Sequence, residues 1–550
     1  MIFSKLPQNP QKSPAKAGFF FWFHAFYNQQ SSTADKKFFI FYYSNFPVPA
    51  QVKQFWYPIL DMKYFYTFIF LFFPLFSGAQ DLQTDVQARL NTPALQGAWW
   101  AGEAGFAGEE PLFSIRAKQR MAPASTLKLI TSAAALETFG PDYRFETRLY
   151  ANAAPDENGT LAGDLYVRGG GDPALGSLRP KGGEDAATVL TRWAKKLKQA
   201  GIRHVSGNIY ADDSLFEGLS VGRKVNWENM GNYYAAPVSA LAIADNSFRI
   251  YFDAQPLHGR LARVSGMKPQ VPGVQITSFA TADAVNRKDN TYVYAAPGQY
   301  QLTLYGTLPA GLQGFSVAAA LPEPALFAVQ YFKQILQENG ITVDGQAKVL
   351  SAAPDYQKMR LLYTQYSVPL KDILYVVNKR SFNFYAEMLA RNLAVHAGEK
   401  GTMENGLKQL EKWLRSKNIP LQDVVLYDAS GLSRDNMLSA RALTGTLNAM
   451  AQSPYFETYY NTLATPNDRG DLLVLRRFLA PQKRIENVRV KGGTIDGVKA
   501  LAGYVKNADG KLISFAFIAN NLDHKDESVF RLHENIIKLL LETRPEDKNE

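Results

Sequence analysis

The 550-residue sequence contains no cysteine and only six histidines. Without cysteine the chain cannot form disulfides, cysteine-ligated zinc sites or iron–sulfur clusters, and it offers no thiol for catalysis or lipidation. The histidines are scattered, and none shows the spacing of a metal site: His24, His204, His258, His396, His524 and His533. We therefore expect neither a metal nor an organic cofactor.

A transmembrane helix is not predicted for the apolar run from Tyr64 to Phe76, because a membrane span needs roughly 20 residues. Met62-Lys63 before this run and Ser77-Gly78-Ala79 after it are typical of a secretory signal peptide that is cleaved after Ala79. We predict that residues 62–79 are this signal peptide and that the protein is exported to the periplasm or cell envelope. Residues 1–61 are then interpreted as an extension upstream of the true start. A membrane-associated leader is the alternative.

Strongly basic segments are also missing from the exported part. Residues 1–61 carry six Lys and two Asp, and Lys63 adds one charge, so cleavage lowers the formal net charge from +10 to about +5. No Lys/Arg block or basic stripe with interleaved aromatic residues predicts a nucleic-acid partner. A mild positive charge is compatible with peripheral contact to an acidic wall polymer or a membrane surface.

A candidate nucleophile begins the stretch Ser125-Thr126-Leu127-Lys128, which opens a predicted helix after Pro123-Ala124. Residues three apart lie on one helix face, so the Ser125 hydroxyl and the Lys128 amine are expected side by side near the positive end of the helix dipole. Serine needs an adjacent base to act as a nucleophile, and a desolvated lysine can supply one. A capping serine before a surface lysine is the simpler interpretation of this stretch alone.

The remaining pattern predicts an α+β protein of two or three domains, in which helices cover an antiparallel sheet. A strand-rich insertion is expected at 150–320, within a domain formed by 80–149 and 321–550. The glycines at 169–171 predict a turn, because no Gly-Lys-Ser/Thr follows them. The expected helices are 82–90, 186–200, 324–338, 373–379, 383–395 and 528–541. The expected strands are 95–101, 111–116, 143–151, 208–211, 248–252, 292–294, 301–305, 488–494, 500–505 and 512–519.

Two further motifs follow the first one. Ser381-Phe382-Asn383 precedes a predicted helix, and Lys491-Gly492-Gly493 lies in a predicted strand. Taken alone, they are explained more simply as a helix cap and a glycine-kinked strand. Together with Ser125-x-x-Lys128, their order resembles the Ser-x-x-Lys, Ser-x-Asn, Lys-Thr-Gly set of penicillin-binding proteins and serine β-lactamases.

The gap of roughly 250 residues between the first two motifs is too long for an ordinary β-lactamase. This spacing resembles that of the D-alanyl-D-alanine carboxypeptidase/endopeptidases of the penicillin-binding protein 4 type (low-molecular-mass class C). In that family, extra domains are inserted between the first two motifs. The resemblance covers nearly all of 80–541. It includes the blocks at 123–129, 169–173, 233–240, 428–433 and 491–504.

This resemblance implies a serine peptidase that acts on peptidoglycan stem peptides and is acylated by β-lactams. Ser125 would attack the carbonyl between two D-alanines and form an acyl-enzyme, with Lys128 as its base. Ser381 would relay a proton to the leaving amine, and Asn383 would hold Lys128 and the substrate amide. The substrate-binding residues would be Lys491, Gly493 and Thr494, with the backbone N–H groups of Ser125 and Thr494 as the oxyanion hole.

Two positions depart from the family pattern. Phe382 stands where the family often has Asp, and Gly492 stands where it has Thr or Ser. The hydroxyl missing at 492 would help to hold the substrate carboxylate, so a lower carboxypeptidase rate or lower β-lactam affinity is expected. Thr494 points to the same face of the strand and is a partial substitute. A β-lactamase-like hydrolase and a catalytically weak peptidoglycan-binding protein stay open as alternatives.

Overall fold

The computed structural model describes residues 82–544, apart from 254–257, 285–288, 313, 471 and 524–527. The predicted signal peptide and the segment before it lie outside the described residues. In the part of the chain that is described, no helix has both the length and the apolar character needed to cross a membrane.

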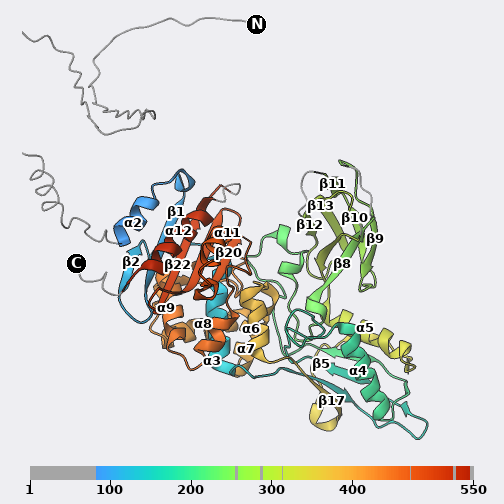
Figure 1. Ribbon diagram of the computed structural model, residues 1–550. Coiled ribbons are helices and arrows are strands. Elements are labelled where there is room, and N and C mark those ends of the chain that lie inside the picture. The colour runs from blue at the N-terminus through green and yellow to red at the C-terminus, as the bar shows by residue number, and fades with distance from the viewer. Residues whose placement is uncertain are drawn as a thin grey trace, which may run out of the picture. The chain divides into compact units, whose positions relative to one another are not determined.

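A five-stranded antiparallel sheet joins the two ends of the described chain (Figure 1). Its order is β2-β1-β22-β21-β20, with β1 Trp99–Phe106, β2 Pro111–Ile115, β20 Val488–Ile495, β21 Val498–Lys506 and β22 Leu512–Asn520. In the central pairing, Gly102 of β1 lies opposite Phe517 of β22. Strand β20 forms one edge of the sheet, where Val490 pairs with Ala464 in an isolated bridge.

Helices cover both faces of this sheet, because side chains alternate between the two faces along each strand. Phe515 and Phe517 of β22 pack in one apolar cluster, whereas Ala516 and Ile518 pack in another. The first cluster includes α2 (Leu82–Arg89), α11 (Leu473–Leu479) and α12 (Ser528–Glu542). The second includes α3 (Lys128–Phe139), α6 (Leu370–Lys379), α7 (Asn383–His396), α8 (Met403–Ser416), α9 (Ala440–Ala451) and α10 (Phe456–Thr462). The predicted α+β class, with an antiparallel sheet covered by helices, is confirmed.

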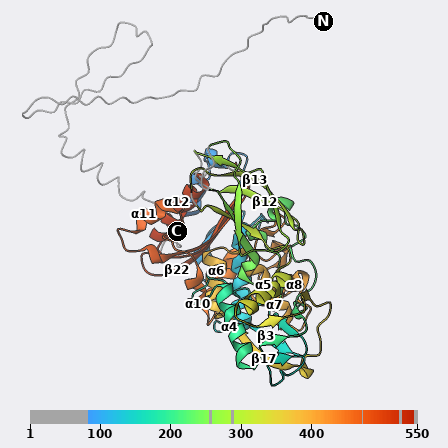
Figure 2. The same cartoon turned by 90° about the vertical axis from the view of Figure 1, so that its right-hand side faces the viewer.

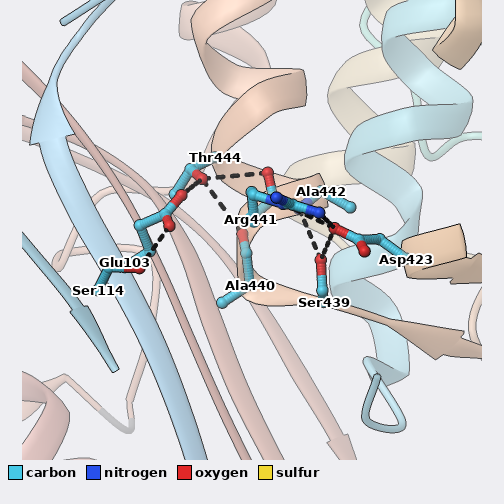
Figure 3. A network of polar contacts seen from close by, with 8 residues as sticks. All are labelled: Glu103, Ser114, Asp423, Ser439, Ala440, Arg441, Ala442 and Thr444. Atoms are coloured by element: carbon cyan, nitrogen blue, oxygen red, sulfur yellow. Dashed lines mark hydrogen bonds and ion pairs between the residues drawn. The ribbon is translucent and has the colours of Figure 1, made fainter. Parts of the chain in front are cut away.

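A buried carboxylate fastens the sheet to α9 (Figure 3). Glu103 of β1 accepts hydrogen bonds from Ser114 Oγ at 2.9 Å and from the hydroxyl of Thr444 in α9. A second carboxylate binds the first turn of α9 through a hydroxyl and a guanidinium: Asp423 with Ser439 and Arg441. Because α9 contacts α3, these bonds support the helix that carries Lys128.

A second apolar core is formed by residues from Leu149 to Val343. It holds a mixed sheet of order β16-β7-β5-β3-β17, with β3 Glu146–Ala151, β5 Leu165–Arg168, β7 Ile209–Asp212, β16 Ala347–Val349 and β17 Arg360–Tyr366. Helices α4 (Ala186–Gln199) and α5 (Pro324–Glu338) pack together beside this sheet through Trp193 and Phe332 (Figure 2). The short strands β4 (Thr160–Leu161), β6 (His204–Val205) and β15 (Thr342–Val343) pair with one another.

Two smaller sheets belong to the same core. One has the order β14-β8-β9, with β8 Ser247–Phe252, β9 Val264–Lys268 and β14 Ser316–Ala320. The other has the order β10-β13-β11, with β12 paired to β13; its bounds are β10 Gln275–Ser278, β11 Thr281–Asp283, β12 Asn290–Tyr294 and β13 Gln301–Pro309. Residues 169–171 form an irregular loop and not the predicted turn, which begins instead at residue 173. The division of the chain at residues 150 and 320 stays a prediction.

Candidate active site

Ser125 lies in a short 3-10 helix, η2 (Ala124–Leu127), and the α-helix α3 begins only at Lys128. Ser125 therefore lies in a helical turn, as predicted, but this turn is a 3-10 helix that precedes the α-helix. Ala124 has a left-handed φ of 46°, which sets the entry into this turn. Thr126 stabilises the turn by donating from its hydroxyl to Pro123 O at 2.7 Å.

Two glycines allow other segments to approach this turn closely. A methyl group at Gly431, which has a left-handed φ of 81°, would lie 1.9 Å from Ala124 O. A methyl group at Gly493 in β20 would lie 2.7 Å from Pro123 O and 2.9 Å from the backbone nitrogen of Ser125. Close approach of backbone to backbone thus requires glycine at both positions.

Lys128 is fully buried and donates to three oxygens, the full number that an ammonium group can serve. Its Nζ lies 2.8 Å from Ser125 Oγ, 2.7 Å from Asn383 Oδ1 and 2.6 Å from the carbonyl oxygen of Ser430. The side-by-side placement of Ser125 and Lys128 that helical spacing predicts is present. Asn383 and Ser430 come from distant parts of the chain and complete the cage around the amine.

Burial lowers the pKa of Lys128 to about 7, and the negative charges of Asp428 and Glu387 oppose this shift. Burial and the negative charge of the neighbouring Asp428 together raise the pKa of Glu387 to about 7. The pKa of Asp428 is raised by burial as well, but its carboxylate accepts N–H donors from Gly431 at 2.7 Å and Ser433 at 2.6 Å. These donors favour the charged form of Asp428, so Glu387 is the member of the pair that takes up a proton near neutral pH.

Ser381 and Asn383 do not cap α7 with their side chains, because the N-cap residue is Phe382 and no side-chain capping bond forms there. The simpler interpretation of these residues as helix caps is therefore wrong. Ser381, with a left-handed φ of 56°, accepts a hydrogen bond from Lys491 Nζ at 2.8 Å. Asn383 donates from Nδ2 to the carbonyl oxygen of Tyr234 at 2.9 Å while its Oδ1 holds Lys128.

Lys491 of β20 is almost completely buried, with 1% of its surface exposed. Besides Ser381, its Nζ contacts the carbonyl oxygen of Gly492 at 2.8 Å. The structure therefore forms two lysine–serine pairs, Lys128 with Ser125 and Lys491 with Ser381.

The two departures from the family pattern have different surroundings. Phe382 is buried in the apolar core, and the guanidinium of Arg179 lies 4.0 Å from the centre of its ring. Gly492 lies against the guanidinium of Arg469: a methyl group at 492 would be 2.2 Å from Nη1 of that residue. Thr494, two residues along β20, is exposed.

A cavity of about 600 Å³ lies beside these groups, a volume within the usual range for small-molecule sites. The predicted substrate-binding residues Lys491 and Gly493 are not among the residues that line the cavity, but Lys491 contacts the lining residue Ser381. Among the residues lining the cavity are Ser125, Tyr234, Tyr292, Ser381, Asn383, Arg434 and Thr494. Within the described ranges, no group of three or more His, Cys, Asp or Glu side chains could hold a metal ion.

Three contributors to this site were not predicted from the sequence. Glu387 lies one helical turn after Asn383, a spacing that could have indicated it. The Ser430 carbonyl and the Arg469 guanidinium reach the site through tertiary packing, and no local pattern in the sequence indicates either role.

Several known proteins are similar to this chain in sequence. Residues 82–538 match the model of the D-Ala-D-Ala carboxypeptidase 3 (S13) family. The chain is 30% identical over 462 residues to a D-alanyl-D-alanine carboxypeptidase of Actinomadura sp. (strain R39), a match that covers 81% of this chain and 82% of that protein. It is 26% identical over 412 residues to the D-alanyl-D-alanine carboxypeptidase DacB of Haemophilus influenzae, covering 74% of this chain and 82% of that protein.

Solved structures share the fold. The crystal structure of penicillin binding protein 4 (dacB) from Haemophilus influenzae matches with a TM-score of 0.71 and 23% identity, over 84% of this chain and 99% of that one. The same protein complexed with a novel β-lactam matches with a TM-score of 0.66 over the same shares of the two chains.

Proposed function

The chain belongs to the D-Ala-D-Ala carboxypeptidase 3 (S13) family, and on this premise we propose that Ser125 is the nucleophile of a serine-type D-Ala-D-Ala carboxypeptidase. The resemblance found in the sequence is thereby confirmed, and the enzyme is a hydrolase of the serine peptidase class. Its proposed substrates are peptidoglycan stem peptides, and its proposed place of action is the periplasm or cell envelope.

The observation that carries the proposal is the contact of 2.8 Å between Lys128 Nζ and Ser125 Oγ. Burial lowers the pKa of Lys128 to about 7, so a large fraction of this amine is neutral at physiological pH. A neutral amine can accept the Ser125 proton across the same contact. Asn383 and the Ser430 carbonyl fix the amine in place, so little reorganisation is needed when the proton moves.

The reaction follows from this geometry. Ser125 Oγ gives its proton to Lys128 and attacks the carbonyl carbon between two D-alanines. The carbon–nitrogen bond then breaks, and the amine of the departing D-alanine takes up the proton released by Lys128, relayed through Ser381. Backbone N–H groups of Ser125 and Thr494 are proposed to stabilise the developing oxyanion, at ~3 kcal/mol per donor. Water then hydrolyses the ester and restores Ser125.

The positive charge of Lys491 is proposed to serve the terminal carboxylate of the substrate. This buried ammonium lies 2.8 Å from Ser381 Oγ, which places the charge directly behind the group that protonates the leaving amine. The same arrangement fits a β-lactam, which combines a reactive cyclic amide with a carboxylate. We propose that β-lactams acylate Ser125 and act as inhibitors.

An endopeptidase activity would use the same chemistry on cross-links that contain a D-amino-acid amide bond. We propose it as a second reaction of the same site, together with an accessory role for the strand-rich region at 150–320. Two alternatives differ from the proposal in the rate at which the acyl-enzyme is hydrolysed. A β-lactamase-like hydrolase would hydrolyse its penicillin acyl-enzyme rapidly, whereas a weak peptidoglycan-binding protein would form little or no acyl-enzyme.

Release of D-alanine from a soluble acetylated tripeptide that ends in D-Ala-D-Ala tests the proposal. The wild-type chain should release D-alanine, and Ser125→Ala should reduce the rate by at least about 10³-fold. Rapid hydrolysis of penicillin without D-alanine release would favour the β-lactamase. Peptidoglycan binding with neither reaction would favour the binding protein.

A further inference from the structure

One face of the small sheet is exposed, and its strands β10, β12 and β13 carry no charged side chain there, whereas the fourth strand, β11, ends in the half-buried Asp283. The exposed positions alternate with buried ones along β12 and β13, as expected for a sheet with a single covered face. The exposed face presents amides, hydroxyls and aromatic rings: Gln275, Thr277, Asn290, Tyr292, Tyr294, Gln301, Thr303 and Tyr305.

Aromatic rings form a continuous run across this face. Trp227 lies 4.8 Å from Tyr294, Tyr294 lies 5.8 Å from Tyr305, and Tyr305 stacks on Phe279 at 5.0 Å between ring centres. Trp227 is 71% exposed, Tyr305 50% and Phe279 46%, whereas rings of this size usually lose most of their exposed surface on folding. An exposed run of this kind indicates a binding surface.

The platform beneath the rings is fixed by hydrogen bonds. Asn232, at the end of the loop that carries Trp227, is buried and donates from Nδ2 to Val293 O at 3.2 Å. In return, Val293 N of β12 donates to Asn232 Oδ1 at 3.0 Å. The Trp227 loop and β12 therefore hold the indole and tyrosine rings in a constant relation, which lowers the entropy lost when a ligand binds.

The surface adjoins the candidate active site. Tyr292 lines the cavity that also contains Ser125, as do Glu228 and Asn229 beside Trp227. Burial and the negative charge of Asp496, which follows β20, raise the pKa of Tyr292. A molecule that extends out of the cavity past Tyr292 would reach the aromatic run.

We propose that this face binds the glycan strand of peptidoglycan, which carries the stem peptide that enters the cavity. The faces of uncharged sugar rings stack on aromatic rings, and their hydroxyl and amide groups pair with the amides and hydroxyls of β10, β12 and β13. The absence of charge on these three strands argues against a nucleic acid or a highly charged peptide as the occupant. The proposal rests on the proposed function, because that function places a stem peptide in the cavity.

Binding to immobilised glycan strands from which the stem peptides have been removed tests the proposal in the full chain. Trp227→Ala and Tyr305→Ala should each weaken binding by about tenfold or more, since truncation of a central aromatic residue typically costs at least that. Tyr305→Phe keeps the ring and should bind within about threefold of the wild type. Tyr366→Ala is the matched control, because Tyr366 is 54% exposed on β17 in a different sheet.

Equal binding by wild type, Trp227→Ala and Tyr305→Ala would overturn the proposal, as would a wild-type chain that does not bind the strands. Self-association that Tyr305→Ala abolishes, without an effect on glycan binding, would assign the face to a second copy of the chain and would also overturn it. Because these strands lack peptides, binding does not depend on Ser125. Failure of the glycan surface is therefore distinguishable from failure of acylation.

Discussion

The guanidinium of Arg469 lies against the α-carbon of Gly492, in the space that a side chain at position 492 would fill. A methyl group there would be 2.2 Å from Nη1 and 2.3 Å from Cζ of Arg469. Arg469 can therefore take this position only because residue 492 is glycine. The family pattern places a hydroxyl at 492, and in this chain a guanidinium occupies the space of that side chain.

Removal of this guanidinium should impair recognition of a carboxylate. We propose that Arg469 contacts the carboxylate of the substrate, and we therefore expect Arg469→Ala to slow acylation by a carboxylate-bearing penicillin by about 10- to 100-fold, because arginine–carboxylate contacts are commonly bidentate and charge-assisted. Acylation by the methyl ester of the same penicillin should change much less. Stopped-flow measurement of both rates tests this.

The double variant Gly492→Thr/Arg469→Ala should recover part of the lost rate, because the threonine hydroxyl then has room beside the strand. Arg477→Ala, on the exposed side of α11, is the matched control for loss of one arginine. Equal slowing of the acid and the ester by Arg469→Ala would mean that Arg469 only supports the structure.

The rate of acylation should rise with pH through a midpoint of about 7, because only neutral Lys128 can accept the Ser125 proton. The same lowered pKa affects folding: between about 7 and the ordinary 10.5, the unfolded chain binds more protons, so the contribution of Lys128 to stability rises with pH in this window. Penicillin acylation rates at about pH 5 to 9 give the midpoint. A flat profile across this range would exclude Lys128 as the base.

Glu387→Gln should move this midpoint to lower pH. The negative charge of Glu387 favours protonated Lys128, so its removal lowers the pKa of the lysine further. Glu399→Gln, at an exposed position just after α7, is the matched control and should leave the midpoint in place. An unchanged midpoint in Glu387→Gln would show that Glu387 stays protonated throughout the titration.

Gly431→Ala should destabilise the protein and slow acylation. The added methyl group would meet Ala124 O at 1.9 Å, and the left-handed backbone at 431 is strained for alanine. Together these effects should lower the free energy of unfolding by about 2–4 kcal/mol. Gly266→Ala, where a methyl group has nothing within 4 Å, is the control for denaturant unfolding curves. Identical curves for the wild type and Gly431→Ala would contradict the close approach of these two segments.

Local patterns were enough to predict many elements of this fold. The strands predicted at 292–294 and 512–519 correspond to β12 and β22, and the apolar stripe of α4 predicted its bounds to within one residue. Helices α8, α9, α10 and α11 were not predicted, although α8 is strongly amphipathic and its pattern was available. The pairing of β1 with β22 could not be derived from spacing, because it joins strands from opposite ends of the described chain.

In the candidate active site, too, local patterns predicted some features, and others depend on tertiary packing. Helical spacing indicated the proximity of Ser125 and Lys128, and the order of three motifs connected these residues with Ser381, Asn383 and Lys491. The actual pairings, Lys128 with Asn383 and Lys491 with Ser381, depend on how the sheet edge meets α3 and α7. The contact of Arg469 with Gly492 depends on packing between a loop and a strand, for which the sequence carries no periodic signal.

Intact-mass analysis of the purified chain after incubation with a labelled penicillin tests most directly whether Ser125 forms the acyl-enzyme. We predict a stable one-to-one adduct on the wild type that is absent from Ser125→Ala. No adduct at any time, with the penicillin intact, would contradict this prediction and favour a binding protein. Consumption of the penicillin without a lasting adduct would instead indicate a β-lactamase.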